Sequence, residues 1–412
     1  MRRVAILALF FVAACDSQID PEGASNSPFL KESDNERQLA GLVFSGTEVV
    51  ERVPVRMDPS AIYLSDARLA ATKDPAWSTF TAAGGVYRFY NAPLRYDLTI
   101  TRGSEVITFR DLVYRYVEPS IGENPTLQTF RAKTRLLVQP PPKAGSVVTL
   151  FAGGTDVTGF RFDTARAEGE IDVRQYATTA TVFAVEHDAV KGIGSATSWA
   201  RVDVSVTANA VVEAALTLVP LIDKPTPIVI NTKAPPGFVV DQVEVVVDFG
   251  VERSAAVVAK VPSGGSVTYT PIPFSRPLAR ARATRADGAT SWSPAMFVDP
   301  KLGKMELELP GPPEDLEPPA GVGGTLFATG KGVHEHVLVP ASGTGTSLRV
   351  VAIEGHATLP DVTRSGLPVP SGKYVWTVAR WPDVSLPDFF SGREVRKVFS
   401  TARSAPREVV FP

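Results

Sequence analysis

The sequence has few of the residues on which several protein classes depend. It contains one cysteine, Cys15, and four histidines among 412 residues. A single cysteine cannot form an intramolecular disulfide, and without other donors it cannot complete a four-cysteine zinc site. The N-terminal apolar run, from Val4 to Ala14, has eleven residues, whereas a membrane-spanning helix needs about 20. The composition therefore excludes a disulfide-rich scaffold and a spanning helix in this segment.

The rest of the composition is that of a folded protein. Hydrophobic residues make up 44% of the chain and charged residues 21%. The 35 prolines and 32 glycines are together about 16% of the sequence, below the roughly 25–30% that is typical of low-complexity disorder. The length corresponds to two or three domains of average size, or to more if the domains are small β modules.

Residues 1–14 have the pattern of a secretory signal peptide. Arg2 and Arg3 form a short basic segment, an apolar stretch follows, and small residues precede Cys15. The sequence from Val12 to Cys15 resembles the lipobox of bacterial lipoproteins, with Val in place of the usual Leu. This resemblance implies that Cys15 is acylated and that the exported protein is lipid-anchored in the bacterial cell envelope. Ordinary cleavage that leaves Cys15 as a free thiol is the alternative.

Residues 15–37 are predicted to form a lipidated cysteine followed by a flexible acidic tether. From Asp16 onward they carry six acidic and two basic residues, a composition that cannot bury enough apolar surface to fold. By enterobacterial sorting rules Asp16 favours the inner membrane, but these rules vary between lineages, so both membranes stay open. The remaining chain has 38 basic and 38 acidic residues, which gives no electrostatic case for binding nucleic acid.

Apolar and polar residues alternate with period two from Gln38 onward. One example is the run from Arg201 to Val206, in which valine alternates with arginine, aspartate and serine. Such alternation with β-branched residues indicates half-buried strands. We find no convincing helical periodicity after the signal segment, so the sequence predicts an all-β protein.

Proline-rich segments at 140–142, 220–227 and 310–319 divide the strands. Proline lacks the N–H that a sheet ladder needs and favours extended spacers, so we interpret these segments as domain boundaries. A four-residue motif, Ala-Thr-Ser-Trp, recurs with a spacing of 93 residues, which suggests a module of about 90 residues used four times. The predicted organisation is a signal peptide (1–14), a tether (15–37), β-sandwiches at 38–138, 143–220 and 226–309, a proline-rich linker (310–320) and a β-sandwich at 321–412.

Parts of these modules resemble known sandwich families. The pattern that resembles carboxypeptidase regulatory-like (transthyretin-like) domains consists of Gly41-Leu42-Val43, Gly85 to Phe89, Asn91, Pro93 and Tyr96 to Ile100. The segment from Ala281 to Pro294 resembles the last hairpin of a fibronectin type III domain, and the fourth module, with Tyr374 to Ala379, is similar to it. These resemblances imply tandem immunoglobulin-like β-sandwich domains, a fold that hosts many functions and specifies none.

Few residues form a candidate site for metal binding or for binding a charged ligand. His334 and His336 share one face of a predicted strand, and with His356 they could form a three-nitrogen metal site. The alternative is that they are solvent-facing strand residues, and we predict no metal and no cofactor. A basic stripe is either a solvated strand face or a surface for an acidic polysaccharide, and it consists of Arg276, Arg280, Arg282 and Arg285.

The segment 381–392 is long for a connection between two strands. It holds three large aromatic residues, Trp381, Phe389 and Phe390, in a region where variable immunoglobulin domains place a binding loop. Aromatic side chains on a rigid loop suit a sugar face or a protein hot spot, so these three are the candidate binding residues. The alternative is that they fold back and cap the core of their own module.

The sequence supports three functional classes. The first is a non-enzymatic, membrane-anchored envelope lipoprotein whose modules serve adhesion, scaffolding or binding of an envelope protein or polysaccharide. The second is a carbohydrate- or cell-wall-binding accessory lipoprotein that depends on Trp381. The third is an enzyme with a site assembled from scattered residues, for which the sequence offers no nucleophile with an adjacent base. We expect the first.

Overall fold

The computed structural model describes most of the chain from Gln38 onward. The described residues are 38–45, 48–60, 78–90, 92, 95–121, 129–152, 160–162, 166–174, 179–191, 195–205, 211–221, 228–248, 255–261, 266–269, 276–299, 301–353, 355–391 and 399–412. By internal contacts the chain divides into two compact units, one of residues 1–125 with 312–412 and one of residues 126–311. The predicted signal peptide, Cys15 and the tether lie outside the described residues.

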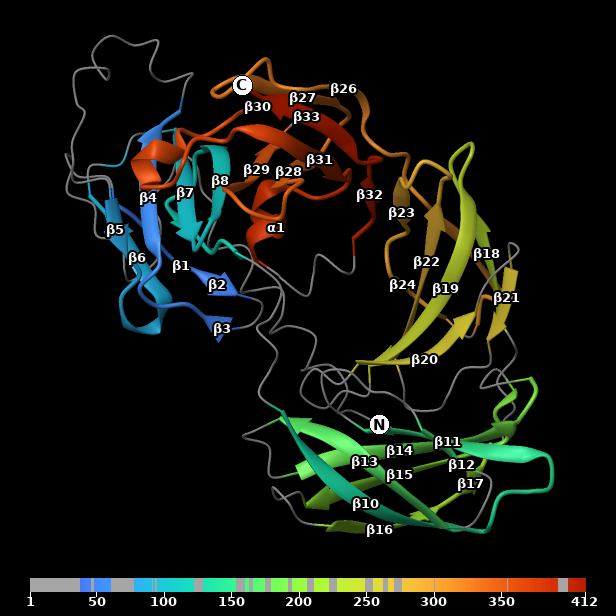
Figure 1. The fold of residues 1–412 in the computed structure, drawn as a ribbon. Coiled ribbons are helices and arrows are strands. Elements are labelled where there is room, and N and C mark those ends of the chain that lie inside the picture. The colour runs from blue at the N-terminus through green and yellow to red at the C-terminus, as the bar shows by residue number, and fades with distance from the viewer. Residues whose placement is uncertain are drawn as a thin grey trace, which may run out of the picture. The chain divides into compact units, whose positions relative to one another are not determined.

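Strands make up nearly all the elements of both units (Figure 1). In the described part of the chain, the one α-helix is α1 (Leu386–Ser391), and short 3-10 turns include η3 (Ala83–Gly85) and η5 (Val362–Ser365). No helix among these residues has the length and apolar character needed to cross a membrane. The predicted all-β class with tandem β-sandwich domains is confirmed.

Module 1 lies in residues 38–125. Its strands are β1 (Leu39–Leu42), β2 (Phe44–Ser45), β3 (Glu48–Val49), β4 (Pro54–Pro59), β5 (Ser78–Phe80), β6 (Val86–Phe89), β7 (Tyr96–Arg102), β8 (Glu105–Leu112) and β9 (Tyr116–Val117). One sheet has the order β6-β1-β9, and a second contains β5-β4-β7-β8. Tyr87 and Phe89 of the first sheet and Leu98 and Ile100 of the second belong to one buried cluster, which is the core of the sandwich.

Modules 2 and 3 lie in residues 126–311. The strands of module 2 are β10 (Thr129–Gln139), β11 (Ser146–Ala152), β12 (Phe160–Phe162), β13 (Arg166–Arg174), β14 (Thr179–Asp188), β15 (Ser198–Ser205), β16 (Val211–Thr217) and β17 (Val219–Pro220). Those of module 3 are β18 (Ile228–Lys233), β19 (Val239–Asp248), β20 (Ala255–Val261), β21 (Ser266–Tyr269), β22 (Arg276–Thr284), β23 (Thr290–Trp292), β24 (Met296–Phe297) and β25 (Lys304–Glu308).

The first three modules share one strand order. In each, the first strand is the centre of a three-stranded sheet, between an antiparallel partner and a parallel partner that comes late in the module. These sheets are β6-β1-β9, β13-β10-β16 and β21-β18-β25. The second sheets contain β5-β4-β7-β8, β12-β11-β14-β15 and β20-β19-β22-β23 in equivalent order. The chain therefore repeats one kind of sandwich.

Two of the predicted boundaries need correction. The predicted first module, 38–138, included β10, but β10 pairs with β13 and β16 and so belongs to module 2. The prolines at 140–142 separate two strands of that module instead of two modules. The predicted linker, 310–320, contains the strand β26 (Glu314–Glu317), because its prolines lie on either side of these four residues and leave their N–H groups free to pair.

Module 4 lies in residues 312–412. Its strands are β26, β27 (Thr325–Thr329), β28 (Val333–Pro340), β29 (Ser347–Ile353), β30 (Ala357–Thr358), β31 (Gly372–Trp381), β32 (Thr401–Arg403) and β33 (Arg407–Phe411). One sheet has the order β26-β27-β30, and in the other β28 lies between β29 and β31, which also pairs with β32 and β33. Here the first long strand, β27, has the preceding segment β26 as an antiparallel partner, where modules 1 to 3 use a parallel strand.

The strands β8 and β29 join module 1 to module 4 in one continuous sheet. They pair in parallel from Glu105↔Ser347 to Phe109↔Val351, and the two strands lie side by side in Figure 1. The edge strand of a sheet carries unpaired N–H and C=O groups, so it can pair with the edge strand of another module. The structure thus corrects the view of four modules in a simple string. The last module returns to the first, and modules 2 and 3 are inserted between them in the sequence.

Candidate functional site

The three aromatic residues predicted to form a recognition loop are buried. Trp381, Phe389 and Phe390 are 8%, 0% and 5% exposed. The rings of Trp381 and Phe389 meet edge to face, with centroids 5.1 Å apart, and Phe389 and Phe390 are 6.2 Å apart in the same way. The structure therefore places these residues in a core and not on an exposed binding surface, because the short helix α1 turns both phenylalanines inward.

The core that these aromatics enter is that of module 1. Phe390 lies against Phe109 of β8, with ring centroids 5.0 Å apart. Trp381, Val384, Leu386, Phe389 and Phe390 form one buried cluster with the residues of β1, β4, β6, β7 and β8. The segment 381–391 is thus a cap, but one that closes the core of the first module with residues of the fourth.

Strand β8 contributes to two cores. Ile107 and Phe109 point into the core of module 1, whereas Val106, on the opposite face, belongs to the core of module 4 with Leu348 and Trp376. All three β8 side chains are at most 1% exposed. We call the contact region formed by β8, β29, α1 and η5 the junction, and we treat it as the candidate functional site.

An ion triad links three strands of the shared sheet. Arg349 of β29 lies 2.9 Å from the carboxylate of Glu105 on β8 and 3.6 Å from that of Glu335 on β28. All three side chains are at most 27% exposed, so solvent screens the contacts less than it would on an open surface. The triad adds charge complementarity to the backbone pairing between the modules.

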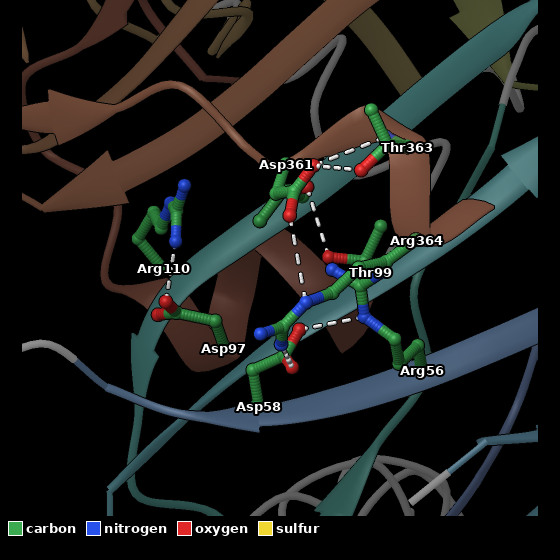
Figure 2. Close-up of polar contacts among 9 residues, drawn as sticks. Arg56, Asp58, Asp97, Thr99, Arg110, Asp361, Thr363 and Arg364 are labelled. Atoms are coloured by element: carbon green, nitrogen blue, oxygen red, sulfur yellow. Dashed lines mark hydrogen bonds and ion pairs between the residues drawn. The ribbon is translucent and has the colours of Figure 1, made fainter. Parts of the chain in front are cut away.

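On the opposite face of the junction, charged side chains of β4 meet the turn η5 of module 4. Figure 2 shows Asp58 between two guanidinium groups, 2.7 Å from Arg56 and 2.9 Å from Arg364. Arg364 also lies 3.5 Å from Asp361. Asp361 in turn accepts hydrogen bonds from Thr363, and the hydroxyl of that threonine holds the pKa of Asp361 below its usual range.

A second pair extends this cluster across β7 and β8. Arg110 forms an ion pair with Asp97 and donates a hydrogen bond to the carbonyl of Thr358 in module 4. Asp97 also accepts a hydrogen bond of 2.8 Å from the backbone N–H of Asp111. Burial raises the pKa of Asp97, and the nearby Arg110 opposes this rise. Next to the pair, Thr99 and Thr108 share a buried hydrogen bond of 3.0 Å.

The chemistry of this polar cluster is that of an interface. Three guanidinium groups face three carboxylates, so the cluster is neutral, and its members are Arg56, Asp58, Asp97, Arg110, Asp361 and Arg364. Interfaces between domains of one chain are usually more polar than a protein core. The arrangement can hold module 4 in one orientation on module 1, since each charge has a specific partner across or beside the contact.

Two of the three candidate histidines lie in a buried core, where we had not expected them. His334 and His336 do share one face of β28, but that face is the core of module 4, where both are 0% exposed. The solvent-facing interpretation is therefore wrong for these two residues. His336 stacks on Trp376 with ring centroids 5.9 Å apart, whereas His356 is exposed and its ring lies tilted against Phe327, with centroids 4.6 Å apart. The part of the chain that the structure describes holds no group of three metal-ligating side chains.

The predicted basic stripe on β22 is compensated by acidic neighbours. Arg280 lies 2.7 Å from Glu244, and Arg282 lies 2.9 Å from Asp241, both on the adjacent strand β19. Arg285 pairs with Asp287 at 2.7 Å in the following turn. These three arginines therefore do not present a surplus of positive charge to an acidic polysaccharide.

Sequence reasoning missed the junction and its polar cluster. Asp97 and Thr99 alternate with apolar residues on β7, which is the pattern of a strand with one solvated face. One signal was present in β8, where Val106 and Ile107 are adjacent and Phe109 follows. A nearly continuous apolar run indicates a strand buried on both faces, so it could have pointed to a covered edge.

No protein-family model and no curated protein sequence matches the chain. Among solved structures, the shaft pilin SpaA from Lactobacillus rhamnosus GG is 10% identical, with a TM-score of 0.15 over 46% of this chain and 99% of the pilin. The TIE protein of Bacillus anthracis is 10% identical, with a TM-score of 0.16 over 65% of this chain and 46% of its own. A minor pilin of Streptococcus agalactiae is 13% identical, with a TM-score of 0.15 over 46% and 99%. Similarity this low supports no conclusion about arrangement, partners or activity.

Replacing Phe390 by alanine is expected to destabilise the unit that holds modules 1 and 4. Loss of a buried phenylalanine typically costs about 3–5 kcal/mol, because the side chain leaves a cavity. Denaturant unfolding of the purified protein measures the change. Phe80→Ala is the matched control, since Phe80 belongs to the same unit but is 65% exposed. Equal stability of the Phe390→Ala variant and the wild type would contradict the burial of α1 in the core.

The buried histidines predict a loss of stability in acid. Burial lowers the pKa of His334 to about 4, aided by the neighbouring Arg380, and lowers that of His336 to about 3, aided by His334. In an unfolded chain histidine has a pKa of about 6.5. The unfolded chain therefore takes up protons first as the pH falls from about 6.5 toward 4, and stability drops by up to about 1.4 kcal/mol per pH unit for each histidine.

Unfolding free energies at several pH values between 7 and 4.5 test this expectation. The variant with both His334→Leu and His336→Leu should lose less stability over this range than the wild type, because two of the groups that take up protons on unfolding are gone. His356→Leu, at an exposed position, should keep the wild-type slope. The same pH slope in the double variant and the wild type would refute the assignment.

Proposed function

We propose that the protein is an exported, lipid-anchored and non-enzymatic scaffold of the bacterial cell envelope, which holds binding modules away from the membrane. The lipobox-like sequence before Cys15 supports the anchor, and the acidic segment after it supports a flexible tether. About 22 residues of flexible chain span roughly 25 Å, enough to separate a folded body from lipid headgroups.

The observation that carries the proposal is the union of modules 1 and 4. The parallel pairing of β8 with β29 and the insertion of α1 into the core of module 1 make the first and last modules one body. Module 1 follows the proposed tether directly in the sequence, and residues 126–311 are inserted between the two modules that form this platform. A platform that presents an inserted pair of sandwiches suits adhesion, scaffolding or capture of an envelope partner.

The residues on which the carbohydrate-binding alternative depended are not available on the surface for a sugar. Trp381 is buried in the junction, and three arginines of the basic stripe are paired with carboxylates. An envelope protein is therefore the partner that we propose. We expect the inserted modules 2 and 3 to meet this partner, because the junction that builds the platform is formed by residues of modules 1 and 4.

We also propose a family relationship among the modules. Module 1 resembles carboxypeptidase regulatory-like domains in sequence, and modules 2 and 3 have its strand order. This shared order favours one family for the first three modules. It also weakens the fibronectin type III-like assignment of module 3, since the hairpin of β22 and β23 is followed by β25 in the other sheet and is not the last of the module. Module 4 departs from this order through β26.

Replacing Cys15 by serine tests the anchor. The variant should move from the membrane fraction to the soluble fraction and should no longer incorporate labelled fatty acid, because the acylated atom is the cysteine sulfur. Ser17→Ala, two residues along the tether, is the control and should stay in the membrane fraction. A Cys15→Ser variant that remains membrane-bound, or a wild-type protein that takes up no fatty acid, would overturn the proposal.

A further inference from the structure

In each of the first three modules, the strand by which the chain enters lies parallel to a strand by which it leaves. In module 1 these are β1 and β9, in module 2 β10 and β16, and in module 3 β18 and β25. The parallel register covers seven residue pairs in module 2 and five in module 3. In module 2 the two residues of β17 follow β16 before the chain leaves. The same device thus occurs three times in succession along the chain.

Additional hydrogen bonds lengthen the short parallel pair of module 1. Ala40 donates to the carbonyl of Arg115 at 2.9 Å, before the paired residues of β9. Phe44 donates to Pro119 at 3.0 Å, and its own carbonyl accepts from Ile121 at 2.8 Å. The contact between the entering and leaving chain therefore runs from Ala40 to Phe44 on one side.

The close approach of the two chains in module 1 depends on a glycine. A Cβ atom at Gly41 would lie 1.8 Å from the carbonyl oxygen of Val117 and 2.6 Å from the hydroxyl of Tyr87. That hydroxyl donates a hydrogen bond of 2.8 Å to the same carbonyl. Gly41 thus lets β1 lie against β9 with a buried tyrosine fixing the leaving strand.

Hydrogen bonds close both ends of the pair in module 3. Val229, near the start of β18, donates to the carbonyl of Gly303 at 3.0 Å. At the other end, Leu309 donates to the carbonyl of Lys233 at 3.0 Å. In module 2, Leu218 donates to Gln139 at 2.7 Å beyond the last register pair. In modules 2 and 3 the parallel ladder therefore runs the full length of the leaving strand, β16 or β25.

Parallel pairing of the terminal strands decides how a module responds to tension. Since the strands point the same way, the chain enters at one end of the ladder and leaves at the other. Tension then draws the two strands past each other along their length, and all the hydrogen bonds between them are loaded together. If the chain entered and left at the same end, tension would open the bonds one after another.

We propose that modules 1 to 3 are load-bearing links that resist tension between the membrane anchor and a bound partner. Each link is held by its parallel terminal strands. Module 4 is not a fourth link, since both partners of β27 are antiparallel and the module is instead docked on module 1, where it braces the link closest to the anchor. This inference rests on the proposed function, because tension arises only in a protein that is anchored at one end and bound at the other.

Two pulling directions on the same module test the inference. In the full chain with Cys15→Ser, Val229→Cys and Glu308→Cys place handles at opposite ends of the parallel pair, and Val229→Cys with Lys304→Cys places them at the same end. All three positions are exposed. In single-molecule force measurements, the opposite-end pair should rupture at a higher force, by up to about fivefold, because five register pairs share the load.

The comparison of rupture forces requires that the two double-cysteine variants have the same thermal stability. Glu308→Cys removes an ion pair with Lys233, but that pair is exposed on both sides and contributes little. Thermal melting should confirm that the two variants are equally stable, so that a difference in force reports geometry. Equal rupture forces for the two handle pairs, or a lower force for the opposite-end pair, would overturn the inference. The measurement uses unlipidated protein, so its outcome is independent of whether Cys15 anchors the chain.

Discussion

The parallel ladder between β8 and β29 is the contact on which the arrangement of modules 1 and 4 depends. It brings Val106 into the core of one module while Ile107 and Phe109 stay in the core of the other. The ion triad around Arg349 crosses the same ladder, and the polar cluster around Asp58 lies on the opposite face from α1. Without this ladder, the aromatic residues of segment 381–391 would have no core to enter, and several buried charges would face water.

The junction joins two modules that lie far apart in the sequence. The first and last modules make one body, and residues 126–311, which lie between them in the sequence, form a second compact unit. The strand order that the first three modules share places the entering and leaving strands side by side in parallel. This arrangement is the one that we propose resists tension along the chain. The platform thus follows from one edge-to-edge pairing, and the proposed load-bearing links follow from one repeated sandwich.

Local pattern was enough to find the strands but not their long-range partners. Alternation of period two located β15, β19 and β31, and the fold class followed. In β19 the alternating polar residues Gln242 and Glu244 are nevertheless buried, as are Val243 and Val245. The prolines at 140–142 misled the boundary because proline interrupts strands within a module as well as between modules. His334 and His336 were correctly placed on one face, yet alternation alone cannot tell a core face from a solvated one. In sequence Asp97 and Arg110 look like surface residues, whereas in the fold they form an ion pair and Arg110 donates a hydrogen bond to the carbonyl of Thr358, 248 residues further along the chain.

A disulfide trap between the two modules tests the central claim most directly. Glu105 and Ser347 are register partners on neighbouring strands, and strands about 4.8 Å apart place such residues within disulfide reach. In a Cys15→Ser background, Glu105→Cys with Ser347→Cys should form an intramolecular disulfide on mild oxidation, visible as a reducible shift in gel mobility. Glu105→Cys with Val410→Cys, at an exposed position on β33, is the control. Efficient closure of the first pair alone is the predicted result, and failure of that pair to close in folded protein would contradict the union of the first and last modules.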